Sequence, residues 1–135
     1  PEAIGSDLDG AFGQAAGTDT PGKGKFVEMA GDAFDPTSPY SGESYDAAAL
    51  ILLAMQAAGS TDPQVYKDKV FDVANAPGEK ILPGELGKAL DILAGGGDID
   101  YVGASNIELI GQGENAGTYR EIEIKGGKVE TVGFR

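Results

Sequence analysis

The sequence predicts an α/β fold in which helices fill the middle of the chain and strands lie at both ends. An apolar run rich in small residues occupies positions 10–17. Three or four segments with helical apolar spacing follow, up to position 97. From position 98 onward apolar and polar residues alternate, which is the period of a strand. With 135 residues, one domain can bury a real core without disulfides or metal ions.

The first element is the run at 10–17, GAFGQAAG, which carries no charge and lies between SDLDG and TDTPG. This pattern predicts one buried strand. The following TDTPGKGK is typical of a turn, and Phe26 to Phe34 has the spacing of about two helical turns. The sequence DPTSPYSG then interrupts the chain again.

The next helix begins at Ser41 to Ser44 and is expected to stop at Gly59. It is apolar on all sides from Ala47 to Met55, which is typical of a central, buried helix. Two interpretations of its polar start remain open. Either Ser41 or Ser44 caps the helix, or the free backbone N–H groups and the positive end of the helix dipole hold a small anionic or amide group.

Two shorter helices are predicted after it. Asp62 is the expected N-cap of the first, with Pro63 at the first helical position. One face of this helix is apolar. The second follows LPGE, has an apolar stripe and is ended by the glycines at 95–97. These apolar positions are Tyr66, Val70, Val73 and Ala74 in the first helix, and Leu86, Ala89, Leu90 and Leu93 in the second.

The last third of the chain predicts a small set of antiparallel strands. Their sequences are IDYVGAS, NIELIG, TYREIEIKG and KVETVGF. The turn Lys125-Gly126-Gly127-Lys128 joins the last two as a tight hairpin. Charged residues along this hairpin protect a sheet edge from pairing with other chains.

Composition excludes several classes of function. The chain has no cysteine and no histidine, which removes thiol catalysis, cysteine-based metal sites and the commonest general base. A net charge of −12 disfavours nucleic acid as a partner. PGKGK is followed by Phe26, where a phosphate loop needs a residue with a hydroxyl group. GQGENAG lacks the glycine spacing of a dinucleotide-binding loop. SDLDG lacks the later ligands of a calcium loop. We therefore predict no catalytic, cofactor-binding or metal-binding residues.

Two longer stretches carry a family resemblance. PYSGESYDAAALILLAMQAAGSTDP, with its Y-D-A and A-G-S-x-D-P motifs, precedes LPGELGKALDILAGGGDIDYVGASNIELIGQGENAGTYREIEIKGGKVETV. In this order they resemble the C-terminal part of type I periplasmic solute-binding proteins of ABC transporters, the branched-chain amino-acid receptor family. The chain departs from the family at NIELIGQGENAG, where PIDFDENGD is common, and this affects the expected loop geometry and ligand class.

The resemblance implies a fold of two Rossmann-like lobes, each a three-layer α/β/α sandwich, with a C-terminal antiparallel hairpin. It places 1–18 and 101–135 in lobe 2 and 19–100 in lobe 1, with crossings near 18–21 and 99–102. The remaining, N-terminal portion of the receptor would supply the neighbours of the front strand and the cover of the apolar helix.

The resemblance also implies a function. Such a receptor captures a small polar solute, here a branched-chain or related amino acid, between its lobes and delivers it to the transmembrane subunits of an ABC permease. Tyr40 corresponds to a position that lines the cleft, and Glu43 and Ser44 are its neighbours. No cofactor is implied. The location would be periplasmic, or extracellular with a membrane anchor in the N-terminal portion.

Three alternatives remain open. The same fold serves receptors for amides, urea and aromatic acids, and amide-sensing regulators of transcription. The chain could also be an acidic domain that acts through a protein contact. A hydrolase that uses paired carboxylates without histidine is chemically possible, although no spacing in the sequence indicates one.

Overall fold

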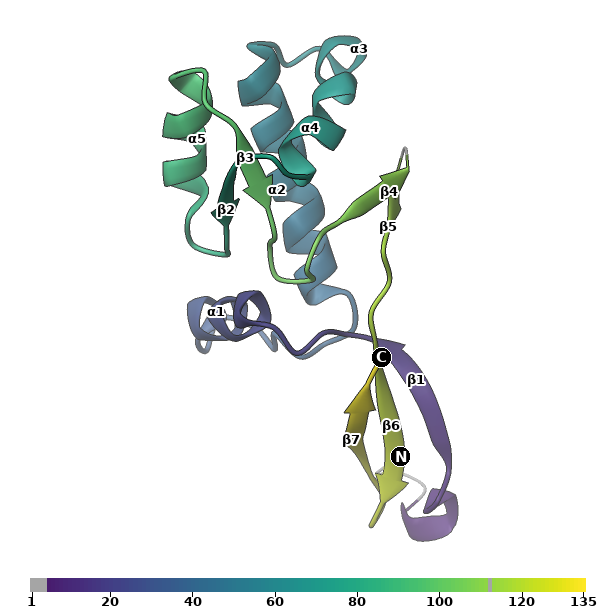
Figure 1. The fold of residues 1–135 in the computed structure, drawn as a ribbon. Coiled ribbons are helices and arrows are strands. Elements are labelled where there is room, and N and C mark those ends of the chain that lie inside the picture. The colour runs from purple at the N-terminus through teal and green to yellow at the C-terminus, as the bar shows by residue number, and fades with distance from the viewer. Residues whose placement is uncertain (1–4, 112) are drawn as a thin grey trace. The chain divides into compact units, whose positions relative to one another are not determined.

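The computed structural model describes residues 5–111 and 113–135. The described chain divides into two compact units, one made from both ends of the chain and one from its middle. Unit 1 consists of residues up to Asp19 together with Gly117–Arg135, and unit 2 is Thr20–Ala116. The mixed α/β composition predicted from the sequence is confirmed, with every α-helix in unit 2 (Figure 1).

Unit 1 is a three-stranded antiparallel sheet. Its order is β1 (Phe12–Ala16), β6 (Tyr119–Lys125), β7 (Lys128–Phe134), and a short 3-10 helix, η1 (Gly5–Leu8), precedes it. The predicted hairpin is present: β6 and β7 are joined through Gly126 and Gly127, whose φ angles of 57° and 74° suit a tight turn. The carboxylate of Asp9 accepts hydrogen bonds from both glycine amides, each at 2.9 Å.

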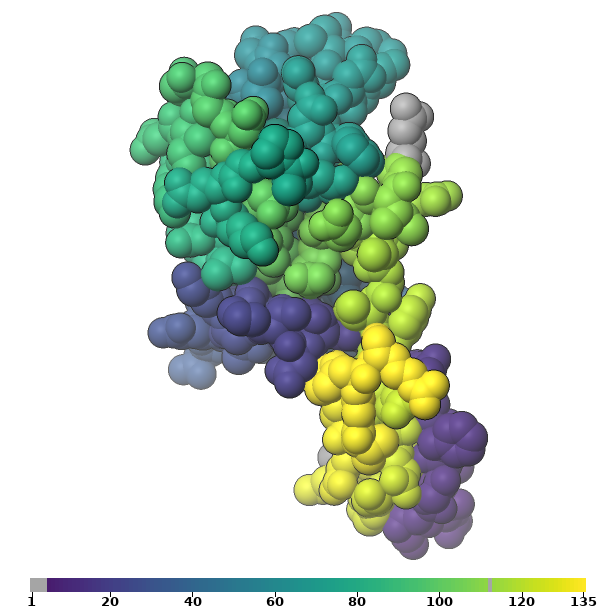
Figure 2. Space-filling model, viewed as in Figure 1, coloured from purple at the N-terminus to yellow at the C-terminus, as the bar shows by residue number. Residues whose placement is uncertain are grey.

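The strand at the front of the chain exists, but it is not buried within the described chain. The resemblance implies that its further neighbours lie in the N-terminal portion of the receptor, so its burial stays a prediction. β1 pairs with β6 on one side only, and the side chain of Phe12 is 90% exposed. The fully buried hydrophobic residues of the described chain all lie in unit 2, so no layer of unit 1 covers the faces of this sheet. In Figure 2 the side chains of β7, shown in yellow, lie on the surface, as their exposure requires.

In unit 2, α1 (Pro21–Ala30) begins earlier than predicted. Thr20 is its N-cap and accepts a hydrogen bond from the amide of Lys23, while Pro21 occupies the first turn. The segment PGKGK is therefore the start of a helix and not a turn. A proline at the first position costs no hydrogen bond, which explains why this proline-containing sequence forms a helix.

The longest helix, α2 (Ser41–Ala58), ends at Gly59 as predicted. It packs against α4 and α5, and its residues Ala49, Leu50, Leu53 and Ala54 lie in the core. Within the described chain it is not covered on all sides, since Ile51 is 43% and Leu52 is 55% exposed. The resemblance implies that the N-terminal portion of the receptor supplies this cover, so full burial of the helix stays a prediction. An apolar sequence does not by itself provide an element to cover each face.

Beyond α2 the predicted amphipathic helix is broken into α3 (Pro63–Tyr66), η2 (Lys67–Lys69) and α4 (Val70–Ala74). Its predicted start is confirmed, because Asp62 accepts a hydrogen bond from the amide of Gln64 at 2.9 Å. The next helix, α5 (Leu86–Ala94), also matches its prediction.

A parallel strand pair flanks α5. β2 (Glu79–Ile81) pairs with β3 (Ile99–Tyr101), and α5 is the crossover between them. The strand β2 was not predicted, and β3 is not part of the antiparallel set in which the sequence placed it. All three residues of β3 are buried, which is usual for a parallel strand.

A short hairpin completes unit 2. β4 (Leu109–Gly111) pairs with β5 (Glu114–Asn115), another strand that was not predicted. The side-chain amide of Asn75 binds the backbone of Leu109 in both directions, at 2.8 and 2.9 Å, and so fixes β4 beside α4.

The lobes implied by the resemblance stay a prediction. The first boundary between the compact units, 19/20, lies one residue from the predicted lobe boundary at 18/19. The second boundary between the units lies at 116/117, whereas the predicted one is at 100/101. The crossings near 18–21 and 99–102 likewise remain expectations.

Candidate functional site

The three residues predicted to bind ligand lie at the N-terminal end of α2. Tyr40 is the N-cap residue, Glu43 is in the first turn, and Ser44 follows it. Tyr40 is 66% exposed and Ser44 is also exposed, while Glu43 is half-buried. The amide of Ser44 donates to the carbonyl of Tyr40 at 2.9 Å, so helical geometry brings Tyr40 and Ser44 one above the other.

The prediction that Ser41 or Ser44 caps the helix is wrong. The N-cap position belongs to Tyr40, whose side chain makes no capping hydrogen bond. The hydroxyl of Ser41 donates instead to the carbonyl of Asp35 at 3.5 Å. The first turn of α2 therefore keeps the positive end of its dipole without a side-chain cap.

Tyr40 has an unusual backbone conformation. Its φ of 65° and ψ of 9° lie in the left-handed region, which a bulky side chain rarely adopts. Among the described residues other than glycine, only Asn106 shares a positive φ, at 58°. Such strain persists where surrounding structure fixes it, and it is common at binding sites.

The loop before α2 is held by the carboxylate of Asp35. This group accepts hydrogen bonds from the amide and hydroxyl of Thr37, at 2.8 and 2.6 Å, and from the hydroxyl of Ser38 at 3.2 Å. The hydrogen bonds from Thr37 are the main reason that the pKa of Asp35 lies below its ordinary value. These hydrogen bonds thus fix the conformation of the loop that leads to Tyr40.

Aromatic packing joins the start of α2 to α1. The ring of Phe26, which is buried, lies 5.4 Å from that of Tyr45 and 5.9 Å from that of Phe34, measured between centroids. The ammonium group of Lys23 lies 5.4 Å from the centre of the Phe26 ring and donates to the carbonyl of Pro36. Lys23, the first of the two lysines of PGKGK, therefore has a structural role.

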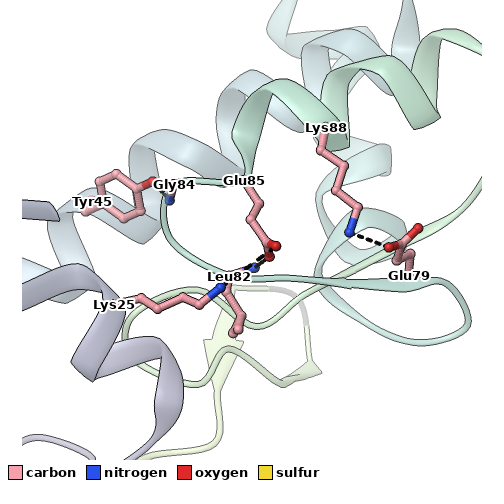
Figure 3. Close-up of polar contacts among 7 residues, drawn as sticks. All are labelled: Lys25, Tyr45, Glu79, Leu82, Gly84, Glu85 and Lys88. Atoms are coloured by element: carbon pink, nitrogen blue, oxygen red, sulfur yellow. Dashed lines mark hydrogen bonds and ion pairs between the residues drawn. The ribbon is translucent and has the colours of Figure 1, made fainter. Parts of the chain in front are cut away.

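Polar contacts tie the same region to the loop before α5 (Figure 3). The hydroxyl of Tyr45 accepts a hydrogen bond from the amide of Gly84 at 3.4 Å. Glu85 accepts from the amide of Leu82 at 2.8 Å and lies 3.9 Å from the ammonium group of Lys25. A further ion pair joins Lys88 to Glu79. The start of α2 is thus supported from α1 and from the chain between β2 and α5.

Asp46 is the residue that sequence reasoning missed. It lies in the second turn of α2 and its side chain is fully buried. One carboxylate oxygen accepts hydrogen bonds from the hydroxyl of Tyr101 and the amide of Ala104, both at 2.8 Å. The other accepts from the amide and the hydroxyl of Ser105, at 2.7 and 2.5 Å. Burial, and next the negative charge of Asp46, raise the pKa of Tyr101.

A signal for Asp46 was present in the sequence. Asp46, Ala49, Leu50 and Leu53 follow the spacing of one helical face, and that face is the buried one. A carboxylate on a buried face must be satisfied by hydrogen bonds or by a cation. Among the residues that the structure describes, no cluster of three or more acidic side chains is arranged to hold a metal ion.

Comparison with known proteins places the fold. No family model matches the chain. A solved structure of the leucine-binding protein LivK from Thermotoga maritima matches 94% of this chain, with a TM-score of 0.62 and 19% identity. The chain therefore has the fold of part of a type I periplasmic binding protein. This confirms the resemblance and the fold class predicted from the sequence.

A sequence relative points to the same kind of protein. The chain is 32% identical over 97 residues to the chemotactic signal transduction system substrate-binding protein BasB from Halobacterium salinarum. The match covers 71% of this chain. The chain spans about a quarter of BasB and about a third of LivK, since the shares covered are 24% and 31%. Both proteins are named as binding proteins and not as enzymes.

One further finding concerns the helices. None of those in the described part of the chain combines the length and the apolar character needed to cross a membrane.

Proposed function

We propose that this chain is part of a non-enzymatic substrate-binding protein that captures a small polar solute, a branched-chain or related amino acid. Support comes from the two relatives, one named for leucine binding and one for substrate binding. The observation that carries the proposal is the exposed, uncapped start of α2, where a strained aromatic residue stands beside a carboxylate and a hydroxyl.

Within this proposal each residue has a distinct role. The ring of Tyr40 packs on the apolar side chain of the ligand, because it is large, exposed and held in a fixed backbone conformation. Ser44 offers a hydroxyl that donates or accepts a hydrogen bond. Glu43 offers a negative charge for the ammonium group of an amino acid. The positive end of the α2 dipole favours the ligand carboxylate nearby.

Capture requires a closed state that the ligand prefers. A ligand shifts a protein between open and closed states only by the difference in its affinity for them. An aromatic ring that contacts the ligand in the closed state alone would contribute to that difference. Tyr40 is suited to this role because its ring is exposed and takes part in none of the aromatic pairs found among the described residues.

We propose delivery of the solute to the transmembrane subunits of an ABC permease, in the periplasm or outside the cell. The name of BasB supports a second receiver, a chemotactic signal transduction system. Binding to one receiver in a pull-down with the purified components, and not to the other, would separate the two.

Calorimetry with the full-length protein tests the ligand class. Leucine, isoleucine and valine are compared with acetamide and urea as probes. We expect one of the amino acids to bind and, at 100 times its dissociation constant, to stabilise the protein by about 2.7 kcal/mol. Nuclear magnetic resonance should then show the amino acid unchanged after prolonged incubation. Binding of the amides alone, or turnover of the ligand, would contradict the proposal.

A substitution tests the site. Tyr40→Ala should raise the dissociation constant at least tenfold, because it removes the ring proposed to cover the ligand. The matched control is Phe71→Ala on α4, which removes a ring that is 45% exposed in the same unit. Equal effects of the two substitutions would show that Tyr40 has no special role.

A further inference from the structure

The buried carboxylate of Asp46 joins two segments that are far apart in the sequence. Its four hydrogen bonds all come from residues 101–105, which are the last residue of β3 and the loop after it, while Asp46 itself lies in α2. Two of the donors are backbone amides, so the bonds fix the path of the loop as well as its side chains. None of the ion pairs found among the described residues includes Asp46.

The loop around Asp46 is too closely packed to accept added side-chain atoms at its glycine and at the glycines that contact it. Gly103 has a φ of 62°, and a Cβ atom there would lie 2.3 Å from a carboxylate oxygen of Asp46. A Cβ atom at Gly22, in the first turn of α1, would lie 2.0 Å from the carbonyl oxygen of Gly103. Gly42, in the first turn of α2, is also closely packed, though less tightly, since its Cβ would lie 3.3 Å from that of Ala104. The starts of both helices therefore press on this one loop.

The strained residues lie on either side of the same contact. Tyr40 precedes α2 by one residue and Asn106 follows Ser105 directly. A left-handed conformation at a tyrosine is unfavourable unless its surroundings enforce it. The bonds of Asp46 hold the helix start and the loop together, and so they hold both strained residues in place.

We propose that Asp46 is a positioning residue for ligand binding: by fixing the loop 101–106 against the first turns of α2, it holds Tyr40, Glu43 and Ser44 in the conformation that receives the solute. This inference rests on the proposed function for its effect on affinity. In this role Asp46 does not touch the ligand. It lowers the free energy that binding must spend on ordering the site, because the site is already held in place.

The test compares three variants of the full-length protein. Asp46→Asn replaces one acceptor oxygen by a donor that faces the donors of the loop. Ser105→Ala is the milder variant, since it removes one hydroxyl and leaves the backbone bonds. Val73→Ala is the control, because Val73 is equally buried but lies in α4 and takes no part in the hydrogen bonds of Asp46.

Affinity is measured for the amino acid that the wild-type protein binds best, at a temperature where each variant is fully folded. We expect the dissociation constant to rise at least tenfold in Asp46→Asn and by a smaller factor in Ser105→Ala. Val73→Ala should lower the melting temperature and leave the dissociation constant within twofold. Wild-type affinity in folded Asp46→Asn, or in folded Ser105→Ala should Asp46→Asn fail to fold, would overturn the proposal.

Hydrogen exchange without ligand separates this inference from the proposed function. The amides of 42–46 and 101–106 should exchange at least tenfold faster in Ser105→Ala and Asp46→Asn than in Val73→Ala. If the wild-type protein binds no amino acid, the proposed function fails, and the exchange data still decide whether Asp46 positions these segments. Unchanged exchange in both segments would refute the positioning role by itself.

Discussion

Replacing Gly103 by alanine should be among the most destabilising single changes in unit 2. The backbone there has a φ of 62°, and the added Cβ would lie 2.3 Å from a carboxylate oxygen of Asp46 and 2.7 Å from a ring carbon of Tyr101. Both distances are far shorter than a van der Waals contact, so either the loop or the carboxylate must move.

The magnitude follows from separate contributions. The left-handed conformation costs a residue with a Cβ atom about 1–2 kcal/mol. Crowding a filled site costs roughly another 1–3 kcal/mol. If the loop moves away, hydrogen bonds to the Asp46 carboxylate are lost, at about 1.5–3 kcal/mol each. We expect a loss of about 3–5 kcal/mol, allowing for relaxation. That is a large part of the 5–15 kcal/mol that stabilises an ordinary domain.

Gly59→Ala isolates the contribution of the backbone. Gly59 has a φ of 60°, almost the value at Gly103, but a Cβ atom added there meets nothing within 4 Å. It should therefore cost only about 1 kcal/mol. Urea denaturation followed by circular dichroism at the helical band reports on unit 2, because all the α-helices of the described residues lie there. Losses that agree within about 1 kcal/mol for the two variants would refute the packing explanation.

Two other outcomes follow from charge and burial. Added sodium chloride should raise the melting temperature, because a net charge of −12 is repulsive and salt screens it; a fall in the melting temperature between low and moderate salt would contradict this. In an alkaline titration followed by ultraviolet absorbance, Tyr101 should stay protonated above pH 10.0, since burial and Asp46 raise its pKa above the ordinary 10.0. The unfolded state then loses a proton that the folded state keeps, so stability is present below pH 10.0 and falls above it. Tyr101→Phe should flatten that fall, and an unchanged slope would show that another group is responsible.

Elements with strong local signals were predictable from the sequence. α2 ends at a glycine, α3 begins at an Asp-Pro pair, and β6 and β7 flank a Gly-Gly turn. Each of these signals acts within a few residues, so no knowledge of the rest of the chain is needed.

Elements that depend on distant partners were not predictable. β2 has three residues, two of them exposed, and it becomes a strand only because β3 pairs with it from across α5. The exposure of Phe12 and Leu52 likewise depends on what covers them, and an apolar sequence carries no record of that. The start of α1 was missed for another reason, since turn-forming residues are also the residues that begin a helix.

The candidate site divides in the same way. The family resemblance led to Tyr40, Glu43 and Ser44, and their ligand-binding role stays a proposal. Asp46 shows its importance only when the loop after β3 is seen folded against α2, because its donors lie 55 to 59 residues away in the sequence. A lone carboxylate on the apolar face of a helix is the sequence signal that could have identified it.

None of the ion pairs among the described residues includes Asp46, so its carboxylate is stabilised by hydrogen bonds and not by a cationic side chain. Removing a carboxylate from water costs several kcal/mol, and neutral donors repay this only when all of them are in place. Four short hydrogen bonds from one loop meet that condition in the observed arrangement. Any shift of the loop against α2 removes hydrogen bonds from the buried carboxylate. The free-energy cost of such a shifted loop is therefore larger than the net stabilisation that the carboxylate gives to the native arrangement. Asp46 thus contributes less to net stability than to the uniqueness of the α2 start, and under the proposed function a ligand would meet residues that are already in place there.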